Sequence, residues 1–368
     1  MQKNDYIFLI GDFDFSDFCS GPQKVSKNLF FELSRKYNVR AYTYYQDGSK
    51  YSYFQKLFKI EAIASGAFIA GIFPILINII RFKPKIIHIT GFRRFTILAL
   101  LLKRFLNYKL FYTVNGIVRL ENKYFRKESK FSMFENKIFE KLIFNKADDI
   151  FYLSDDSLQM IKYYFKSPNA SYHLIENGIE KEFYDHRKTA DNLNEPLRIC
   201  FSANVNKKEK GFDFFADCMG KLQFPITLIV FSDDEIEKKF NDNVKIVKYN
   251  LKNTTEYIKA AEEADIIISS SNYENFNLSL VEMMAMGKVP VVTKQTGASR
   301  FITDGVNGFT FNYGDSVSLI KILNDLNQNR DKLKLISGNA IKIYDTLSWE
   351  KVITKYENVY DKYLMQDE

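Results

Sequence analysis

Residues 274–292 read ENFNLSLVEMMAMGKVPVV, and this stretch decides how the chain is interpreted. Residues 278–286 contain good helix formers and neither Gly nor Pro, so they predict a helix with Asn277 as its N-cap. Gly287 fits the left-handed position that ends many helices, and residues 289–293 are rich in β-branched side chains. The stretch therefore predicts a loop, a capped helix, a glycine stop and a strand.

Two glutamates seven residues apart flank the start of this helix. Glu274 lies on the preceding loop, and Glu282 lies about one turn into the helix. A helix N-terminus offers N–H groups and a positive dipole to a diphosphate, and carboxylates accept hydrogen bonds from sugar hydroxyls. A lone pair of glutamates is more often two solvated side chains, but the order of loop, cap, helix and strand favours a sugar-nucleotide site.

This segment resembles the E-x7-E signature of the family 4 retaining glycosyltransferases, which have the GT-B fold. Four further marks follow in the family's order: a glycine-rich loop, a turn that ends the first domain, a donor-phosphate pair and a closing segment. They are Ser20-Gly21-Pro22, Glu176-Asn177-Gly178-Ile179, Lys210-Gly211 and Ser348-Trp349-Glu350. The resemblance covers nearly the whole chain and implies sugar transfer from a nucleotide sugar, with no cofactor and no metal site.

Buried apolar runs alternate with longer helical patterns such as residues 25–37, which predicts parallel sheets covered on both faces. The expected strands are residues 6–10, 86–89, 110–114, 150–153, 173–175, 197–202, 226–231, 244–247, 266–269 and 289–293. The polar residues 187–196 are typical of a linker. We therefore expect an α/β protein of the GT-B class, with two doubly wound Rossmann-like domains facing across a cleft. The domains are residues 1–186 and 187–347, and a C-terminal helix at 348–366 packs back on the first.

The composition is that of a large folded enzyme. A length of 368 residues and a hydrophobic content of 46% support two domains with real cores and argue against disorder. Cys19, Cys200 and Cys218 are too few for a disulfide framework or a zinc site and indicate a reducing compartment. The N-terminus does not resemble a signal peptide, so we expect a cytoplasmic protein, with peripheral binding to the inner face of the plasma membrane as an option.

A lysine-rich loop follows the first expected strand of the second domain. Lys210 presents a point charge to phosphate oxygens, and Gly211 permits close backbone approach. The family often has an arginine where Asn204 stands, and Lys207 or Lys208 would replace that cation. By resemblance Lys210 holds the donor diphosphate, although a lysine-rich loop can also be a solvated surface turn.

The resemblance implies roles for individual residues in the second domain. Glu282 would bind the ribose, Glu274 the sugar, and Lys210 with the amides of residues 276–279 the diphosphate. The expected donor-binding residues are Gly21, Asn204, Lys207, Lys208, Lys210, Glu274, Asn275, Phe276, Asn277, Leu278, Ser279 and Glu282, and the catalytic candidates are Glu274, Lys210 and Asn115. No dedicated base is evident, so a donor phosphate oxygen would take the acceptor proton.

Several positions depart from the family's pattern. Asn275 and Asn277 stand where the family has glycine, and asparagine tolerates left-handed backbone better than most residues. Arg300 stands where the family often has glutamate, and Asn115 where it often has histidine. Asn115 can hydrogen-bond a hydroxyl but cannot act as a base at neutral pH. These changes leave the reaction class in place and the identity of the sugar open.

Residues 81–130 carry thirteen Lys and Arg side chains against two acids, Glu121 and Glu128, with aromatic residues between them. A basic, aromatic surface suits an anionic membrane or a lipid-linked acceptor, and we take Arg93, Arg94, Lys103 and Arg104 as its centre. An ordinary basic helix surface is an equally serious interpretation. Nucleic acid is the weakest, because no nucleic-acid-binding motif accompanies the charge.

Residues 62–80 are uncharged and mostly apolar, which raises the question of a membrane-spanning helix. Ser65, Gly66, Gly71, Pro74 and Asn78 interrupt the run. We expect a buried or membrane-touching helix here rather than a spanning one.

The sequence as a whole predicts a retaining glycosyltransferase that moves a sugar, with a UDP-sugar as the expected donor, to a lipid-linked saccharide or another surface-polysaccharide precursor. One alternative is a GT-B-like nucleotide-sugar epimerase, which needs no acceptor. The other is a non-catalytic protein that binds membrane or nucleic acid through residues 81–130. The sugar, the acceptor, the linkage and the oligomeric state stay open.

Overall fold

The computed structural model describes residues 5–17, 19–45, 51–91, 96–118, 130–165, 169–190, 196–232, 234–250 and 253–365. The chain forms two compact units: Met1–Glu176 with Val352–Glu368 (unit 1), and Asn177–Lys351 (unit 2). The division after Glu176 differs from the sequence-based boundary after His186. Residues 177–190 belong to unit 2 because they bond to its later segments. Lys188 N donates to Met286 O at 3.0 Å, and Ala190 N donates to Ser337 Oγ at 3.0 Å.

Unit 1 is built on one twisted sheet with helices on both sides. Among the described residues the strand order is β3-β4-β2-β1-β5-β6-β7-β8, and all neighbours are parallel except β3 and β4. The strands are β1 (Tyr6–Ile10), β2 (Asn38–Thr43), β3 (Ile60–Ala64), β4 (Ala67–Ala70), β5 (Ile86–Ile89), β6 (Lys109–Thr113), β7 (Asp149–Tyr152) and β8 (Ser171–Leu174). The helices are α1 (Gly21–Ser34), α2 (Tyr53–Phe58), α3 (Ile72–Phe82), α4 (Ile97–Leu102), α6 (Lys130–Lys146) and α7 (Asp155–Tyr164).

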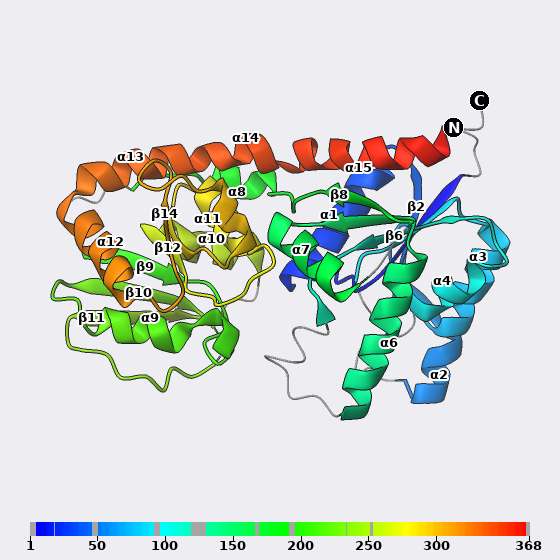
Figure 1. Ribbon diagram of the computed structural model, residues 1–368, viewed down its shortest axis with the longest axis horizontal. Helices are drawn as coiled ribbons and strands as arrows, with labels where there is room; N and C mark the ends of the chain where they lie inside the picture. Colours follow the sequence, from blue (N-terminus) through cyan, green and yellow to red (C-terminus); the bar gives the residue numbers. More distant parts are fainter. Residues whose placement is uncertain are drawn as a thin grey trace. The chain divides into compact units, whose positions relative to one another are not determined.

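The last helix, α15 (Trp349–Leu364), begins in unit 2 and continues along the sheet of unit 1 (Figure 1). Its Tyr360 hydroxyl lies 2.5 Å from His88 Nδ1, and His88 Nε2 lies 2.7 Å from Thr113 Oγ1. Burial lowers the pKa of His88 to about 3, so the imidazole is neutral and serves as a core hydrogen-bonding group. Tyr363 donates to Asp149 Oδ2 at 2.8 Å. These bonds explain why the C-terminal residues belong to unit 1.

The expected single helix at residues 62–80 is wrong in its first half. That part forms the antiparallel pair β3 and β4, and only α3 is helical. Gly66 adopts φ +81 in the connecting turn, a conformation that a helix cannot contain, and Gly71 is the N-cap of α3. Within the described residues, no helix is both long enough and apolar enough to cross a membrane.

Unit 2 has a smaller sheet in which all neighbouring strands are parallel. Among the described residues the order is β11-β10-β9-β12-β13-β14. The strands are β9 (Leu197–Phe201), β10 (Ile226–Phe231), β11 (Val244–Tyr249), β12 (Ile266–Ser269), β13 (Val289–Thr293) and β14 (Phe309–Phe311). The helices are α8 (Lys181–Asp185), α9 (Phe212–Met219), α10 (Thr254–Glu262), α11 (Leu278–Ala285), α12 (Ser316–Gln328), α13 (Arg330–Ala340) and α14 (Tyr344–Leu347).

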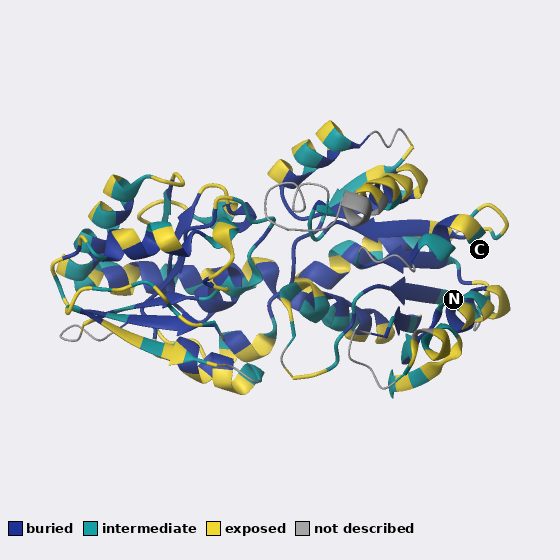
Figure 2. Cartoon of the chain, turned by 90° about the horizontal axis from the view of Figure 1, so that it is seen from below, coloured by how far each residue is buried: buried dark blue, intermediate teal, exposed yellow. Residues whose placement is uncertain are grey.

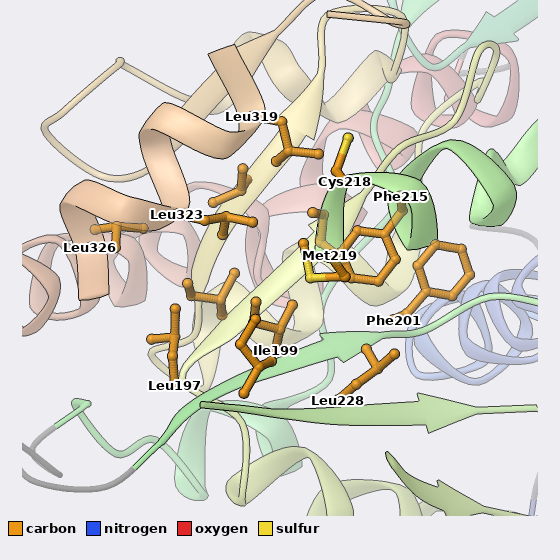
Figure 3. Packing of buried hydrophobic residues seen from close by; sticks show 14 of the residues in the cluster. Leu197, Ile199, Phe201, Phe215, Cys218, Met219, Leu228, Leu319, Leu323 and Leu326 are labelled. Atoms are coloured by element: carbon orange, nitrogen blue, oxygen red, sulfur yellow. The ribbon is translucent and has the colours of Figure 1, made fainter. Parts of the chain in front are cut away.

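The core of unit 2 lies between its sheet and the helices α9 and α12 (Figure 3). Leu197 and Ile199 of β9 belong to one buried cluster with Phe215 and Met219 of α9. Leu323 of α12 belongs to the same cluster. Most strands of both units are buried on both faces, as Figure 2 shows in dark blue. This is why they appear in the sequence as continuous apolar runs rather than alternating patterns. The prediction of two parallel-sheet, Rossmann-like domains is confirmed.

Candidate functional site

The N-terminus of α11 is fixed by the side chain of Asn277. This residue adopts φ +78, and its Oδ1 accepts a hydrogen bond from Leu280 N at 3.1 Å. Ser279 Oγ donates to the same oxygen at 3.1 Å, and Asn277 Nδ2 donates to Ser269 Oγ at 3.1 Å. The predicted N-cap is therefore present, and the left-handed backbone is one that asparagine accepts. The first-turn N–H groups of α11, which have no partner within the helix, lie at the carboxyl edge of the sheet.

The loop before α11 is held as an extended segment. Glu274 N donates to Gln295 O at 3.2 Å, and Gly297 N donates to Glu274 O at 2.8 Å. Ala298 N donates to Phe276 O at 2.9 Å, and the Phe276 side chain is buried. These bonds fix the backbone on both sides of Glu274.

Lys210 and Glu274, which are far apart in the sequence, form an ion pair. The backbone around Lys210 is held against the loop that leads to Glu274. Ser270 Oγ donates to Lys210 O at 3.1 Å and to Gly211 O at 2.9 Å. Gly211 adopts φ +67, and a Cβ there would lie 2.1 Å from Ser270 O. We call this arrangement of Lys210, Gly211, Ser270 and Glu274 the lysine–glutamate clasp.

Ser270 is a residue whose role the sequence-based interpretation missed. It belongs to a run of three serines that begins with Ser269, the last residue of β12. Small polar side chains at the carboxyl end of a buried parallel strand are a usable signal, because ligands of such sheets lie beyond that edge. The bonds of Ser270 to Lys210 and Gly211, however, depend on a contact between residues far apart in the sequence.

Glu282 lies in α11 and is only 4% exposed. The pKa of the neighbouring Tyr257 is raised well above its ordinary value, first by burial and then by the negative charge of Glu282. Glu282 therefore faces the interior next to α10, whereas Glu274 stands at the edge of the sheet. The two glutamates of the motif have different surroundings, which the spacing alone did not indicate.

The remaining lysines of this loop border a depression that reaches Gly211. Lys207 and Lys208 are exposed and line this depression, of about 450 Å³, together with residues that include Gly211, Glu235 and Tyr313. Asn204 is exposed and accepts a hydrogen bond from Asn206 N at 3.0 Å, which forms a local turn. Arg300 is exposed, with its guanidinium 4.8 Å from the ring centre of Phe301. Of the three candidate lysines, the structure brings Lys210 to Glu274.

Two candidates belong to unit 1. Asn115 follows β6, and its Nδ2 donates to Thr90 O at 2.7 Å, which ties together the loops after β6 and β5. Gly21 is the first residue of α1, whose start carries a capping box formed by Ser20 and Gln23. Apart from its own helix backbone and chain neighbours, none of the described residues has a heavy atom within 4 Å of a Cβ built on Gly21.

The proposed basic centre is only partly described. Arg93 and Arg94 lie outside the described residues. Lys103 is paired with Asp148 at 2.6 Å, which reduces its charge toward any partner, and Arg104 is exposed. Among the described side chains, no group of three or more His, Cys, Asp or Glu is arranged to hold a metal ion.

Comparisons with known proteins identify the class. The family described as Glycosyltransferase Family 4 matches residues 21–183, and the one described as Glycosyl transferases group 1 matches residues 196–329. The fold is similar to that of sucrose-phosphate synthase from Thermosynechococcus elongatus, with a TM-score of 0.77, 14% identity and coverage of 98% of this chain and 99% of that one. The chain is a GT-B glycosyltransferase. This identification removes the alternative of a non-catalytic binding protein.

Further similar proteins are glycosyltransferases too. An uncharacterized glycosyltransferase of Methanocaldococcus jannaschii is 26% identical over 70% of this chain and 69% of its own length. The lipopolysaccharide 1,2-N-acetylglucosaminetransferase of Salmonella typhimurium is 26% identical over 55% of this chain and 61% of its own length. Among solved structures, HepE of Anabaena in complex with UDP-glucose has a TM-score of 0.70 and 15% identity, covering 97% of this chain and 98% of that one.

Proposed function

We propose that this glycosyltransferase transfers a sugar from a UDP-sugar, with retention of configuration, to a glycan or lipid-linked acceptor. The observation that carries the proposal is the lysine–glutamate clasp at the N-terminus of α11. It joins a cation, a helix N-terminus and an acceptor-only carboxylate, which are the groups that the diphosphate and the sugar of such a donor require.

The ion pair suggests how the donor would enter. Without a donor, Glu274 neutralises Lys210. A diphosphate at the start of α11 carries more negative charge than one carboxylate, so Lys210 would turn to the phosphate oxygens. Glu274 would then be released to accept hydrogen bonds from the sugar hydroxyls. Donor binding thus exchanges one partner of Lys210 for another and leaves the backbone of both residues in place.

The chemistry of this proposal needs no protein base. Lys210 and the first amides of α11 would stabilise the negative charge that develops on the departing diphosphate. A phosphate oxygen of the donor would take the proton of the acceptor hydroxyl on the same face, which gives retention. Asn115 would position a hydroxyl, since its amide can donate and accept but cannot take up a proton at neutral pH.

The similar proteins support the choice of donor and acceptor class. HepE of Anabaena is described in complex with UDP-glucose, and the Salmonella relative is named for its action on lipopolysaccharide. The three cysteines, Cys19, Cys200 and Cys218, are free thiols, which agrees with a reducing compartment where nucleotide sugars would be used. We place the reaction in the cytoplasm, at its boundary with the membrane.

Calorimetric titration with UDP, with GDP and ADP as controls, tests the donor site. Wild-type protein should bind UDP selectively, and Lys210→Ala should weaken binding by about tenfold or more, because one charge-assisted contact is lost. Lys245→Ala removes an exposed lysine on β11 and serves as the matched control, with unchanged affinity.

Three results would contradict the proposal. Selective binding of GDP or ADP would mean that the donor carries a nucleotide other than UDP. Failure of every nucleotide to bind folded protein would mean that the chain has no donor site here. Conversion of the UDP-sugar in the absence of any acceptor would favour the epimerase. Retention is tested separately by the anomeric configuration of the product in the NMR spectrum.

A further inference from the structure

Helix α3 is apolar on the side that faces solvent as well as on the side that faces the protein. Pro74, Ile75 and Ile79 are buried. Another face of the helix is exposed and carries Phe73, Ile77 and Ile80, which are spaced at helical intervals. The exposed fraction of Ile77 is 60%. A helix that is apolar all round is normally buried in a core or in lipid. Before Arg81 in its last turn, the exposed face of α3 therefore lacks the polar side chains that water would favour.

The neighbouring helix α2 extends the same apolar surface. The rings of Phe58 and Phe73 are stacked, with centres 4.5 Å apart and planes at 9°, so α2 and α3 lie side by side (Figure 1). Phe54 is 70% exposed, and its ring centre lies 5.3 Å from that of Phe58. The α2–α3 surface consists of Phe54, Phe58, Ile60, Phe73, Ile77 and Ile80, all of them exposed. Contiguous apolar patches of this kind mark interaction sites.

The segment that carries the α2–α3 surface has mostly positive charges. Residues 51–85 contain five Lys or Arg and one acid, Glu61. The Glu61 carboxylate accepts a hydrogen bond from the Tyr51 hydroxyl. Lys59, Arg81 and Lys83 are exposed next to the apolar side chains. The surface thus combines aromatic and branched side chains with a cationic rim.

We propose that the α2–α3 surface docks on an anionic lipid bilayer, with its Phe and Ile side chains in the headgroup region and its basic residues on lipid phosphates. This combination of an apolar face and Lys or Arg at its edge is what interfacial helices use. A second copy of the chain fits less well. A two-fold interface would bring each cationic rim against its own copy, and like charges repel.

The inference goes beyond the proposed transfer reaction and stands whether or not the donor is a UDP-sugar. It also shifts the centre of the expected membrane contact along the chain. From the sequence, a basic and aromatic surface was centred on Arg93, Arg94, Lys103 and Arg104, and residues 62–80 were expected to form a buried or membrane-touching helix. The structure offers apolar side chains on α2 and α3 that can enter the bilayer, whereas Lys103 is already paired with Asp148.

The test is flotation of the full-length protein with vesicles of phosphatidylcholine containing about one third phosphatidylglycerol, without any donor. Wild type should float with these vesicles and bind pure phosphatidylcholine vesicles at least about tenfold more weakly. Phe54→Ser with Ile77→Ser should lower partitioning into the anionic vesicles by about tenfold or more. Lys59→Glu with Arg81→Glu should weaken it and reduce its salt dependence.

A matched control is available in unit 2, where Val317 and Leu335 are 77% and 66% exposed. Val317→Ser with Leu335→Ser should bind vesicles as wild type does. All variants should keep the wild-type circular dichroism and melting temperature, because the changed side chains are exposed. Absence of vesicle binding by wild type would overturn the proposal. So would binding that survives the α2–α3 changes, or a dimer in light scattering that the same changes dissolve.

Discussion

Helices α3 and α11 are similar in composition and opposite in environment. Both are rich in Leu, Ile, Val or Met. In α11, every residue from Leu280 to Ala285 is buried, including Glu282, whereas α3 exposes Phe73, Ile77 and Ile80. The contrast shows that apolar composition does not tell whether a helix is covered by its own chain. Burial depends on what the rest of the fold places against each face.

The ends of the two helices differ in the same way. Lys83 caps α3 in the left-handed conformation and is exposed. Lys288 follows Gly287 at the end of α11, is only 3% exposed, and donates through Nζ to Glu262 O at 2.9 Å. A lysine after an apolar helix is thus a surface residue in one case and an interior residue in the other.

The largest expected effect is the loss of stability when an apolar side chain is truncated in α11, compared with the same kind of truncation in α3. Met283→Ala in α11 removes fully buried atoms and should lower the free energy of unfolding by about 2–5 kcal/mol. Ile77→Ala in α3 removes a side chain in contact with solvent and should change it by about 0.5 kcal/mol or less. Urea unfolding of both variants measures the difference, and equal losses would refute the contrast between the helices.

A smaller effect is expected at the lysine–glutamate clasp. Gly211→Ala meets both a left-handed backbone and the Ser270 carbonyl, and should lower the free energy of unfolding by about 3 kcal/mol. Gly314→Ala shares the left-handed backbone, at φ +85, but in the part of the chain that the structure describes no heavy atom beyond its chain neighbours lies within 4 Å of the new Cβ. It should cost about 1 kcal/mol. If both variants unfold at the same urea concentration, the close approach of the two loops is not what requires Gly211.

The third prediction concerns pH. Burial lowers the pKa of Lys288 from 10.5 to about 8. The unfolded chain therefore binds more protons than the folded one between these values, and this contribution makes stability rise with pH across that window. The penalty is fully present below pH 8 and is gone above 10.5. Lys288→Met removes this titration.

The measurement is the difference in unfolding free energy between wild type and Lys288→Met at several pH values. Wild type should gain about 3 kcal/mol relative to the variant from about pH 7.5 to 10.5. Lys59→Met is the control for loss of an exposed lysine. A difference that stays constant with pH would mean that Lys288 is hydrated in solution.

The positions of many strands could be predicted from the local sequence. The predicted strands at residues 6–10, 86–89, 226–231, 266–269 and 289–293 coincide with β1, β5, β10, β12 and β13. Other strands are shifted by one or two residues at an end. Strands β2, β3, β4 and β14 were not predicted. The last has three residues. The end of β3 and all of β4 lie in the continuous apolar run of residues 62–80, which resembles a buried helix.

The candidate site was predictable to a similar extent. Asn277 as cap, Glu274 on the loop and Gly287 at the helix end all follow from neighbouring residues, and the structure has each of them. The choice of Lys210 over Lys207 and Lys208 as the partner of Glu274 rests on the bonds of Ser270, which come from another strand. Their part in binding a donor remains a prediction.

The sequence by itself determined the parallel α/β class, the helix start at Asn277, the glutamate spacing and the cationic character of residues 51–85. Each depends on backbone preferences or charges that neighbouring residues set. Only the tertiary structure decided that Lys210 meets Glu274, that Glu282 and Lys288 are interior, and that the outer face of α3 is left uncovered. Those facts depend on which distant segments pack together, because burial and ion pairing are properties of contacts and not of the local chain.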